Sequence, residues 1–515
     1  MSPVTLASRV RGLGWLVPLW IALTLLALMP IWTARLIPML DTPNHLALIR
    51  AWHSFDDPRY RIAENFTLHI QLAPYLAYYW INHMLMYVVS IETANRLVLS
   101  LYVIGFPLCM LALVRSLRRD AALALFAFPL MFNQNWMYGF TAYNLAVASL
   151  LLCVAVALRY LDEGKVWQVV LVGVLGALTF LFHIMPYVYL GLLGLGLIYS
   201  DWRRWKRLLL LASSLVPSLV MAVQSVRSSQ DDGVYFRAKG TFAATWRDFP
   251  TSVMEFPRRV MELFPGSWDA VALGLLAGAA MALYLWRETA PAPQSELTQR
   301  RVKAFLWLLG IAYLSIPYEI SKPFSWWFVS PRVPPIMMLL IPLWPSRPMT
   351  GRWRWLMAPV VIAALILPVR LTQLYRSFSV RNAGFMRLVS EVPLGAPCLV
   401  LLNNLIIHSP KFEEKSGDPS SSAPVYWHFL SWPMALRGGY SAYVFDQGIP
   451  VRPKNKLPSP NWVDTSGFHI RQAPDYEYYL GYNSAQLDRE PGLEVVDEAG
   501  SWTLYHRRVS ATDEP

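Results

Sequence analysis

The sequence has few charged residues for its length. Only 15% of its 515 residues are Asp, Glu, Lys or Arg, and 55% are hydrophobic. Soluble domains carry about 25% charged residues. With a mean hydropathy of +0.34, much of this chain must avoid water.

Cysteine and the common enzyme motifs are also scarce or missing. Of the three cysteines, Cys109 and Cys153 lie in apolar runs and Cys398 lies far downstream. No pair has metal-site spacing, and no disulfide framework is implied. The sequence contains no Walker loop, dinucleotide fingerprint, HExxH or GxSxG, so nucleotide-driven and serine-hydrolase functions lack support. No acidic residue interrupts a central apolar run, which argues against an ion-coupled transporter.

Long apolar runs are what the sequence has instead. Residues 12–34 carry no charge, exceed the length of a signal-peptide core and lack a small-residue cleavage site, which indicates a retained signal anchor. Further runs lie near 97–114, 121–137, 141–158, 166–182, 186–200, 208–224, 268–286, 304–317, 333–345 and 355–369. The pattern predicts a polytopic α-helical membrane protein with about 11 spans.

The net charge of +12 comes largely from short basic gaps between these runs. Such gaps follow the positive-inside rule, and anionic lipid headgroups are their natural partner, so we expect no nucleic-acid binding. The gaps are "RSLRRD" (115–120), "RRWKR" (203–207), "QRRVK" (299–303) and "SRPMTGRWRW" (346–355).

Charge also predicts the orientation. With Arg9 and Arg11 in the cytoplasm, the basic gaps all lie in the cytoplasm if just one of the segments 71–90 and 97–114 crosses the membrane, and outside it if both cross. The first is rich in Tyr and polar residues, which favours a helix lying on the outer surface. A transmembrane domain over 1–372 is therefore expected, with extracytoplasmic loops at 35–95, 133–144, 225–267 and 318–332.

The chain changes character after residue 372, where charge rises and apolar runs shorten. "PCLVLLN", "EYYLGY", "LEVVDE" and "WTLYHRR" are typical of strands, and "EEKSGDPSSSAP" (413–424) of a polar loop. We expect a small extracytoplasmic α/β domain over 373–515.

The outer loops hold the unusual polar residues. In "DTPNH", Pro43 suits a first helical turn with Asp41 or Thr42 as its cap, and His45 falls about one turn after Asp41, with Asn44 beside it. The helix dipole favours the ionised carboxylate there. The pattern fits either a reactive pair or a capped helix with an interfacial histidine.

Two further loops carry candidates for substrate binding. Amides and a phenol in "NQNWMYGFTAYN" suit sugar hydroxyls, although helix capping and a turn at Gly139 explain them equally well. Arg332, on the outer side against the charge bias, suits a lipid phosphate or an interfacial anchor. The candidates in this loop are Asn133, Asn135, Tyr138 and Asn144, and weaker ones elsewhere are His183 and Glu319.

The segment "APYLAYYWINHMLMYVVSIETANRLVLSLYVIGFPLCMLALVRSLRRDAALALFAFPL", preceded by an acidic residue after the first span, resembles the GT-C superfamily of membrane glycosyltransferases. Aminoarabinose transferases and protein O-mannosyltransferases are its similar members. The resemblance covers roughly residues 15–200, and "SPRVPPIMMLLIPL" is similar to a later element of the family.

The resemblance implies an inverting glycosyltransferase of the bacterial inner membrane. It would move a sugar from a polyprenyl-phosphate donor to a glycan, lipid or protein acceptor outside the cytoplasm. Asp41 would be the general base, tuned by His45, and Arg332, helped by Arg96, would stabilise the phosphate. The family's second acidic residue, which helps to bind a divalent metal or the acceptor, is replaced by Asn144, so metal dependence stays open.

Two other functions fit the sequence. A lipid or polysaccharide transporter would move substrate without forming a glycosidic bond, and an inverted repeat would favour it. A non-catalytic membrane scaffold subunit would depend on the tail and tolerate changes in the polar loop residues.

Overall fold

The structure is a computed structural model. The residues it describes are 14–508 apart from 232–242, 265, 288–292, 323–325, 345–346, 348, 350, 403–422, 446–449, 455–468, 474 and 484–486. Arg9 and Arg11, on which the predicted orientation rests, and most of the predicted loop 413–424 lie outside the described residues.

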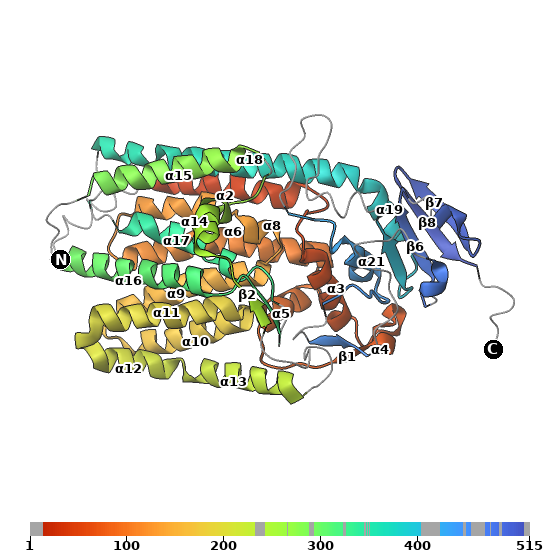
Figure 1. The fold of residues 1–515 in the computed structure, drawn as a ribbon, viewed down its shortest axis with the longest axis horizontal. Coiled ribbons are helices and arrows are strands. Elements are labelled where there is room, and N and C mark those ends of the chain that lie inside the picture. Colours follow the sequence, from red (N-terminus) through yellow and green to blue (C-terminus); the bar gives the residue numbers. More distant parts are fainter. Residues whose placement is uncertain are drawn as a thin grey trace.

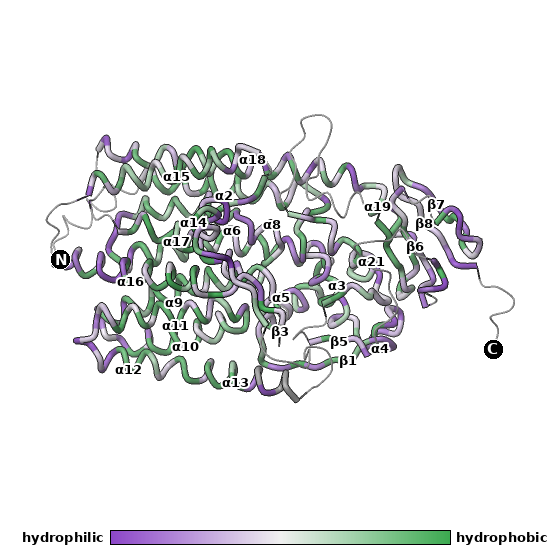
Figure 2. Tube along the Cα trace, viewed as in Figure 1, coloured by the Kyte–Doolittle hydropathy of each residue, from purple (hydrophilic) through white to green (hydrophobic). Residues whose placement is uncertain are grey.

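Most of the chain forms a bundle of helices that run along the long axis of the molecule (Figure 1). Hydrophobic residues predominate along these helices, and hydrophilic ones gather at their ends and in the C-terminal part (Figure 2). The bundle consists of α2 (Leu16–Thr33), α6 (Ile91–Ser116), α9 (Thr141–Glu163), α10 (Val166–Phe182), α11 (Ile184–Asp201), α12 (Trp205–Ser214), α13 (Val216–Asp231), α15 (Trp268–Leu285), α16 (Pro293–Ser315), α17 (Pro334–Leu340) and α18 (Ala358–Arg381).

Six helical stretches among the described residues are long and apolar enough to cross a membrane. The predicted class of helical membrane protein is therefore confirmed. The run at 121–137 is divided into η2 (Ala121–Phe126), α7 (Ala127–Leu130) and α8 (Gln134–Met137), and α17 has only seven residues. The count of about 11 spans stays a prediction.

Short helices lie at the end of the bundle opposite the basic gaps (Figure 1). Among them is α5 (Leu76–Leu85), which at 10 residues is too short to cross a bilayer of ~30 Å. That 71–90 does not span stays a prediction. The other short helices at this end are α3 (Thr42–His53), α4 (Ile62–Asn65), α19 (Ala383–Glu391) and α21 (Trp432–Arg437), whereas α14 (Phe249–Val260) packs against α15 and α17.

The C-terminal part contains a four-stranded sheet of order β4–β6–β8–β7, in which only β4 and β6 are parallel. Its strands are β4 (Cys398–Leu401), β6 (Tyr478–Tyr482), β7 (Leu493–Ala499) and β8 (Trp502–Arg507), which confirms the four predicted strands. The predicted domain boundary at residue 372 lies inside α18, and the extracytoplasmic placement of 373–515 stays a prediction.

Two further pairs of strands join distant segments. β1 (Phe66–Leu68) pairs antiparallel with β5 (Val451–Pro453), so the first large loop and the C-terminal part are hydrogen-bonded to each other. β2 (Ala243–Thr245) pairs with β3 (Glu319–Lys322).

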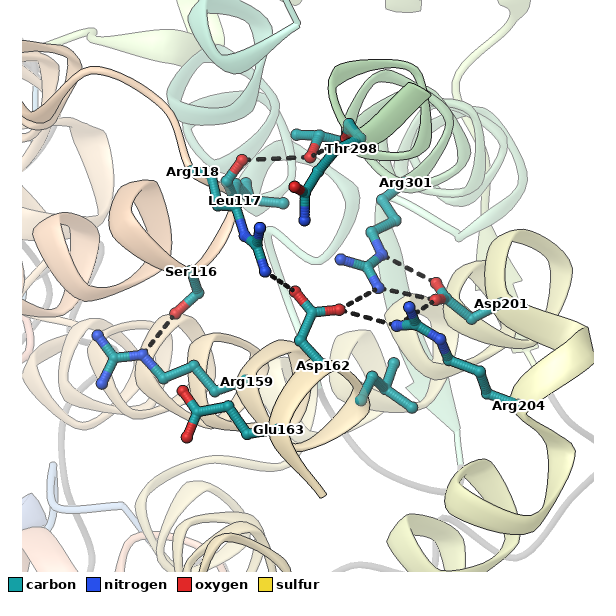
Figure 3. Close-up of polar contacts among 12 residues, drawn as sticks. Ser116, Leu117, Arg118, Arg159, Asp162, Glu163, Asp201, Arg204, Thr298 and Arg301 are labelled. Carbon is teal, nitrogen blue, oxygen red and sulfur yellow. Dashed lines mark hydrogen bonds and ion pairs between the residues drawn. The ribbon is translucent and has the colours of Figure 1, made fainter. Parts of the chain in front are cut away.

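At the basic end of the bundle, a cluster of ion pairs connects α9, α11 and α16 (Figure 3). Arg301 donates to both oxygens of Asp201 at 2.8 and 2.7 Å, and both side chains are almost fully buried. Arg204 contacts Asp201 and Asp162, and Arg118 contacts Asp162 from the end of α6. Each buried carboxylate is thus shared between two or more guanidinium groups.

We expect Asp201→Asn to destabilise the protein, because it leaves the buried Arg301 with only Asp162, at 3.5 Å. Breaking a buried pair costs on the order of 3 kcal/mol. The midpoint of thermal unfolding in detergent should fall, and R301Q added to D201N should restore part of it. Glu64→Gln, in an exposed pair with Arg61, is the control and should change little. Equal losses in D201N and E64Q would contradict this role.

Candidate functional site

A cavity of about 420 Å³ lies where the first loop, the helix bundle and the C-terminal part meet. Its wall is mostly aromatic, with a carboxylate, three imidazoles and a guanidinium. The lining residues are Leu40, Asp41, His45, Tyr75, Tyr138, Phe140, Tyr143, His183, Met185, Trp326, Trp327, Val329, Arg332, Trp427, His428 and Phe445. Five of the predicted site residues, Asp41, His45, Tyr138, His183 and Arg332, are brought together here.

The backbone of Asp41 is held by the neighbouring turn. The amide of Asp41 donates to the carbonyl of Tyr138 at 3.0 Å, and that of Leu40 donates to Met137. Gly139 adopts φ +75°, and a Cβ there would lie 2.9 Å from the Asp41 nitrogen. Glycine is therefore required at this turn for both its backbone conformation and its close approach.

The Asp41 side chain is not used as a helix cap. Asp41 occupies the N-cap position of α3, but its carboxylate accepts no capping hydrogen bond. Instead, its Oδ1 lies 3.0 Å from Nδ1 of His428, at ion-pair distance though outside hydrogen-bond geometry. Because the carboxylate makes no capping hydrogen bond, it is available to interact with a ligand in the cavity.

His45 has a different neighbour from the one predicted. Its Nδ1 lies 2.8 Å from the Tyr79 hydroxyl, and its ring packs edge-on against Tyr78 and Tyr79. Burial lowers the pKa of His45 to about 4, against the raising effect of the Asp41 carboxylate. His45 is therefore neutral at pH 7, and the imidazole in contact with Asp41 belongs to His428.

Arg332 forms the second polar group of the cavity. Its guanidinium donates to the carbonyls of Phe328 (2.9 Å) and Trp327 (3.3 Å), and Nη1 lies 3.1 Å from Nε2 of His183. It also stacks over the Phe140 ring at 4.1 Å. Among the described residues no carboxylate lies within ion-pair distance of it, although Arg332 is only 9% exposed.

His183 lies beside this cation but does not neutralise it. Burial, with the nearby Arg332 charge as a smaller cause, holds the pKa of His183 well below its usual value. Its Nδ1 accepts from the Met185 amide, so it also caps the start of α11. A neutral ring leaves the positive charge of Arg332 uncompensated, and a buried cation of this kind favours an anionic ligand.

The C-terminal part supplies one wall of the cavity, through Trp427, His428 and Phe445. Asn44 holds this wall in place: its Nδ2 donates to the Tyr443 carbonyl at 2.9 Å, and its Oδ1 accepts from the Phe445 amide at 2.8 Å. The predicted residue Asn44 is thus a structural link behind the cavity and does not line it.

Five other predicted residues lie outside the cavity. Arg96 donates to the carbonyls of Ala34 and Arg35 at the end of α2, and Glu319 belongs to β3. The three amides Asn133, Asn135 and Asn144 line a separate cavity of about 10 Å³ behind Tyr143. Asn133 caps α8 there, as the capping alternative predicted.

Sequence reasoning did not identify His428, Tyr75 or Tyr143. Tyr75 and Tyr143 stand in the quoted loops and could have been added on their aromatic character alone. His428 had no such signal, because nothing in the spacing relates "VYWHFLSW" to residue 41. Among the described residues, no group of three or more His, Cys, Asp or Glu side chains could hold a metal ion.

Fold and cavity together define a polytopic helical membrane protein with one site at the end of its bundle. No family model matches the sequence, and no curated protein sequence does. The solved structures that are similar include two crystal structures of ArnT from Cupriavidus metallidurans.

The apo ArnT structure has a TM-score of 0.50 and 12% sequence identity, over 96% of this chain and 98% of that chain. The structure bound to undecaprenyl phosphate has a TM-score of 0.49 and 12% identity, over 98% and 99%. The apo structure thus shows that the chain has a fold similar to that of ArnT over nearly its whole length, which confirms the predicted resemblance at the level of fold.

The low pKa of His45 predicts how stability depends on pH. Folded His45 binds a proton only near pH 4, whereas an unfolded histidine does so near 6.5. The unfolded state therefore holds more protons between these values, and the free energy of unfolding falls as the pH drops from 6.5 toward 4, by about 3 kcal/mol for this residue.

We expect the midpoint of thermal unfolding in detergent to fall over this range, and His45→Asn to reduce the slope. His183 should keep part of it, because its pKa is also lowered. The surface variant His469→Asn is the control. A slope unchanged in H45N would show that His45 is not buried and neutral.

Proposed function

We propose that the protein is an integral-membrane glycosyltransferase that moves a sugar from a polyprenyl-phosphate donor to an extracytoplasmic acceptor. The observation that carries the proposal is a buried, uncompensated Arg332 and a carboxylate, Asp41, in one aromatic cavity at the end of a GT-C-like bundle. A phosphate leaving group and an acceptor hydroxyl need a cation and a base at the same site.

Arg332 would bind the phosphate of the donor. A guanidinium matches phosphate geometry with its planar fork, and its two backbone-carbonyl contacts fix its orientation before substrate binds. As the bond between the sugar C1 and the phosphate oxygen breaks, negative charge grows on that oxygen. Arg332 would stabilise this charge, and polyprenyl phosphate would leave.

Asp41 would act as general base. An acceptor hydroxyl would attack C1 from the face opposite the phosphate, form the new glycosidic bond and pass its proton to the Asp41 carboxylate. Attack from that face inverts the configuration at C1. His428, 3.0 Å from Asp41, would orient the carboxylate. Neutral His45 would position Tyr79, and the aromatic wall, including Trp327 and Phe445, would stack against the sugar.

The orientation of the site follows from the charge. Asp162 and Asp201, which pair with the arginines, lie at the C-terminal ends of α9 and α11, and the cavity is lined from the N-terminal ends of the same two helices by Tyr143 and Met185. With the basic end in the cytoplasm of a bacterial inner membrane, the cavity and the C-terminal part would be extracytoplasmic.

We expect Asp41→Asn to abolish turnover, because losing a positioned base typically costs ~10²–10⁴-fold. The purified protein in lipid would receive a panel of undecaprenyl-phosphate sugars and candidate acceptors, with release of undecaprenyl phosphate read by mass spectrometry. Glu319→Gln, outside the cavity, is the matched control and should retain activity. Near wild-type turnover of D41N would remove Asp41 from the mechanism.

No release from any donor, with donor still bound, would favour the transporter or scaffold functions. A flux measurement in sealed vesicles would then separate those two.

Arg332→Gln should lower turnover by about 10²–10³-fold, because a preorganised donor to the developing charge is lost. Arg96→Gln is the control, since it removes an outer-side arginine that only contacts helix-end carbonyls. Single-turnover assays of the two variants make the comparison. Equal losses in both would mean that general basicity, rather than the position of Arg332, supports the reaction.

A further inference from the structure

A second cavity, of about 330 Å³, lies at the basic end of the bundle and shares no lining residue with the first. It sits between the end of α11, the short helix η3 (Trp202–Arg204) and the first turns of α16. The lining residues are Ser200, Asp201, Trp202, Arg203, Arg204, Pro293, Glu296, Leu297 and Arg300.

One acidic residue of this cavity, Asp201, belongs to the ion-pair cluster of Figure 3. Both oxygens of Asp201 accept from Arg301, so Asp201 is already compensated from behind. Glu296 reaches Arg300 only at 3.8 Å, and both side chains are more than half exposed. An exposed pair at this distance contributes little.

Positive charge is in excess here. Arg203 has no ion-pair partner among the residues that the structure describes, and Arg300 has only its weak contact with Glu296. The lining residues and their direct partners include four arginines (203, 204, 300 and 301) and three carboxylates (162, 201 and 296). The excess is carried by Arg203 and Arg300, which line the cavity and are exposed.

The rim of the cavity carries large exposed aromatic side chains. Trp202 is 63% exposed and Trp205 58%, at the point where α11 passes into α12. Tryptophan in such a position is typical of the headgroup region of a bilayer. The apolar face that follows on α12, with Leu209 exposed, continues toward the hydrocarbon.

We propose that this cavity binds the headgroup phosphate of an anionic membrane lipid, with Arg203 and Arg300 contacting the phosphate. A single guanidinium binds phosphate in a planar, two-point manner, and Arg203 and Arg300 both line this cavity. The tryptophan rim and the ends of the spanning helices favour a lipid over a soluble phosphate. The proposal concerns the opposite end of the bundle from the cavity around Asp41 and does not rest on glycosyl transfer.

The test uses the full-length protein in lipid nanodiscs that contain phosphatidylglycerol and phosphatidylcholine. Native mass spectrometry would count retained lipids and titrate phosphatidylglycerol into wild type and R203Q/R300Q. Hydrogen bonds to a charged group are strong enough that losing both guanidinium contacts to the phosphate should weaken phosphatidylglycerol binding about 10²-fold. Phosphatidylcholine retention should not change.

The matched control is R352Q/R354Q, which removes the same charge at the same end of the bundle, from residues that stack on Trp353 and Trp15. It should bind phosphatidylglycerol as wild type does. Equal weakening in both double variants, or none in R203Q/R300Q, would overturn the site. Displacement of the lipid by inorganic phosphate alone at millimolar concentration would instead assign the cavity to a soluble anion and overturn the lipid.

Discussion

The position of the Asp41 backbone is the constraint on which the cavity depends. Hydrogen bonds from Leu40 and Asp41 to the turn at 137–139 fix the start of α3, and Gly139 allows the two segments to touch. Because these contacts place the helix start, the carboxylate need not cap it. A side chain that would stabilise an isolated helix is therefore left for the cavity, as functional residues often are in a fold stabilised elsewhere.

The two ends of the bundle treat charge in opposite ways. At the basic end, Asp162 and Asp201 are each shared among several guanidinium groups, so burial is compensated locally. At the other end, Arg332 donates to two carbonyl oxygens and lies beside a neutral imidazole. The carbonyl dipoles orient the guanidinium without neutralising it, which keeps its charge for a ligand.

The sequence predicts the helix positions well, because an uncharged run long enough to cross a bilayer satisfies its backbone hydrogen bonds there by forming a helix. It also predicts the four strands of the C-terminal sheet and the cluster of Asp41, His45, Tyr138, His183 and Arg332 around one cavity. The positions of the basic gaps already predict that these residues lie on the same side of the membrane.

The rest depends on contacts that no local pattern encodes. Arg96, Glu319 and the loop amides are polar residues in the same loops, but their partners are nearby carbonyls, caps and a strand. His428 approaches Asp41 from almost 400 positions away, through a chain path set by the β1–β5 pairing and the Asn44 link. Side-chain direction and long-range pairing decide both outcomes, and a single sequence records neither.

Because these contacts join segments far apart in the sequence, membrane insertion of the helices and completion of the cavity occur at different times. The helices up to α18 can enter the membrane one after another as they are made, since each satisfies its own backbone hydrogen bonds. The wall with Trp427, His428 and Phe445 can join them only after these residues have been made and Asn44 has bonded to Tyr443 and Phe445, contacts of very high sequence separation. Membrane insertion therefore precedes completion of the cavity, and a nascent chain already anchored in the bilayer still lacks the imidazole beside Asp41.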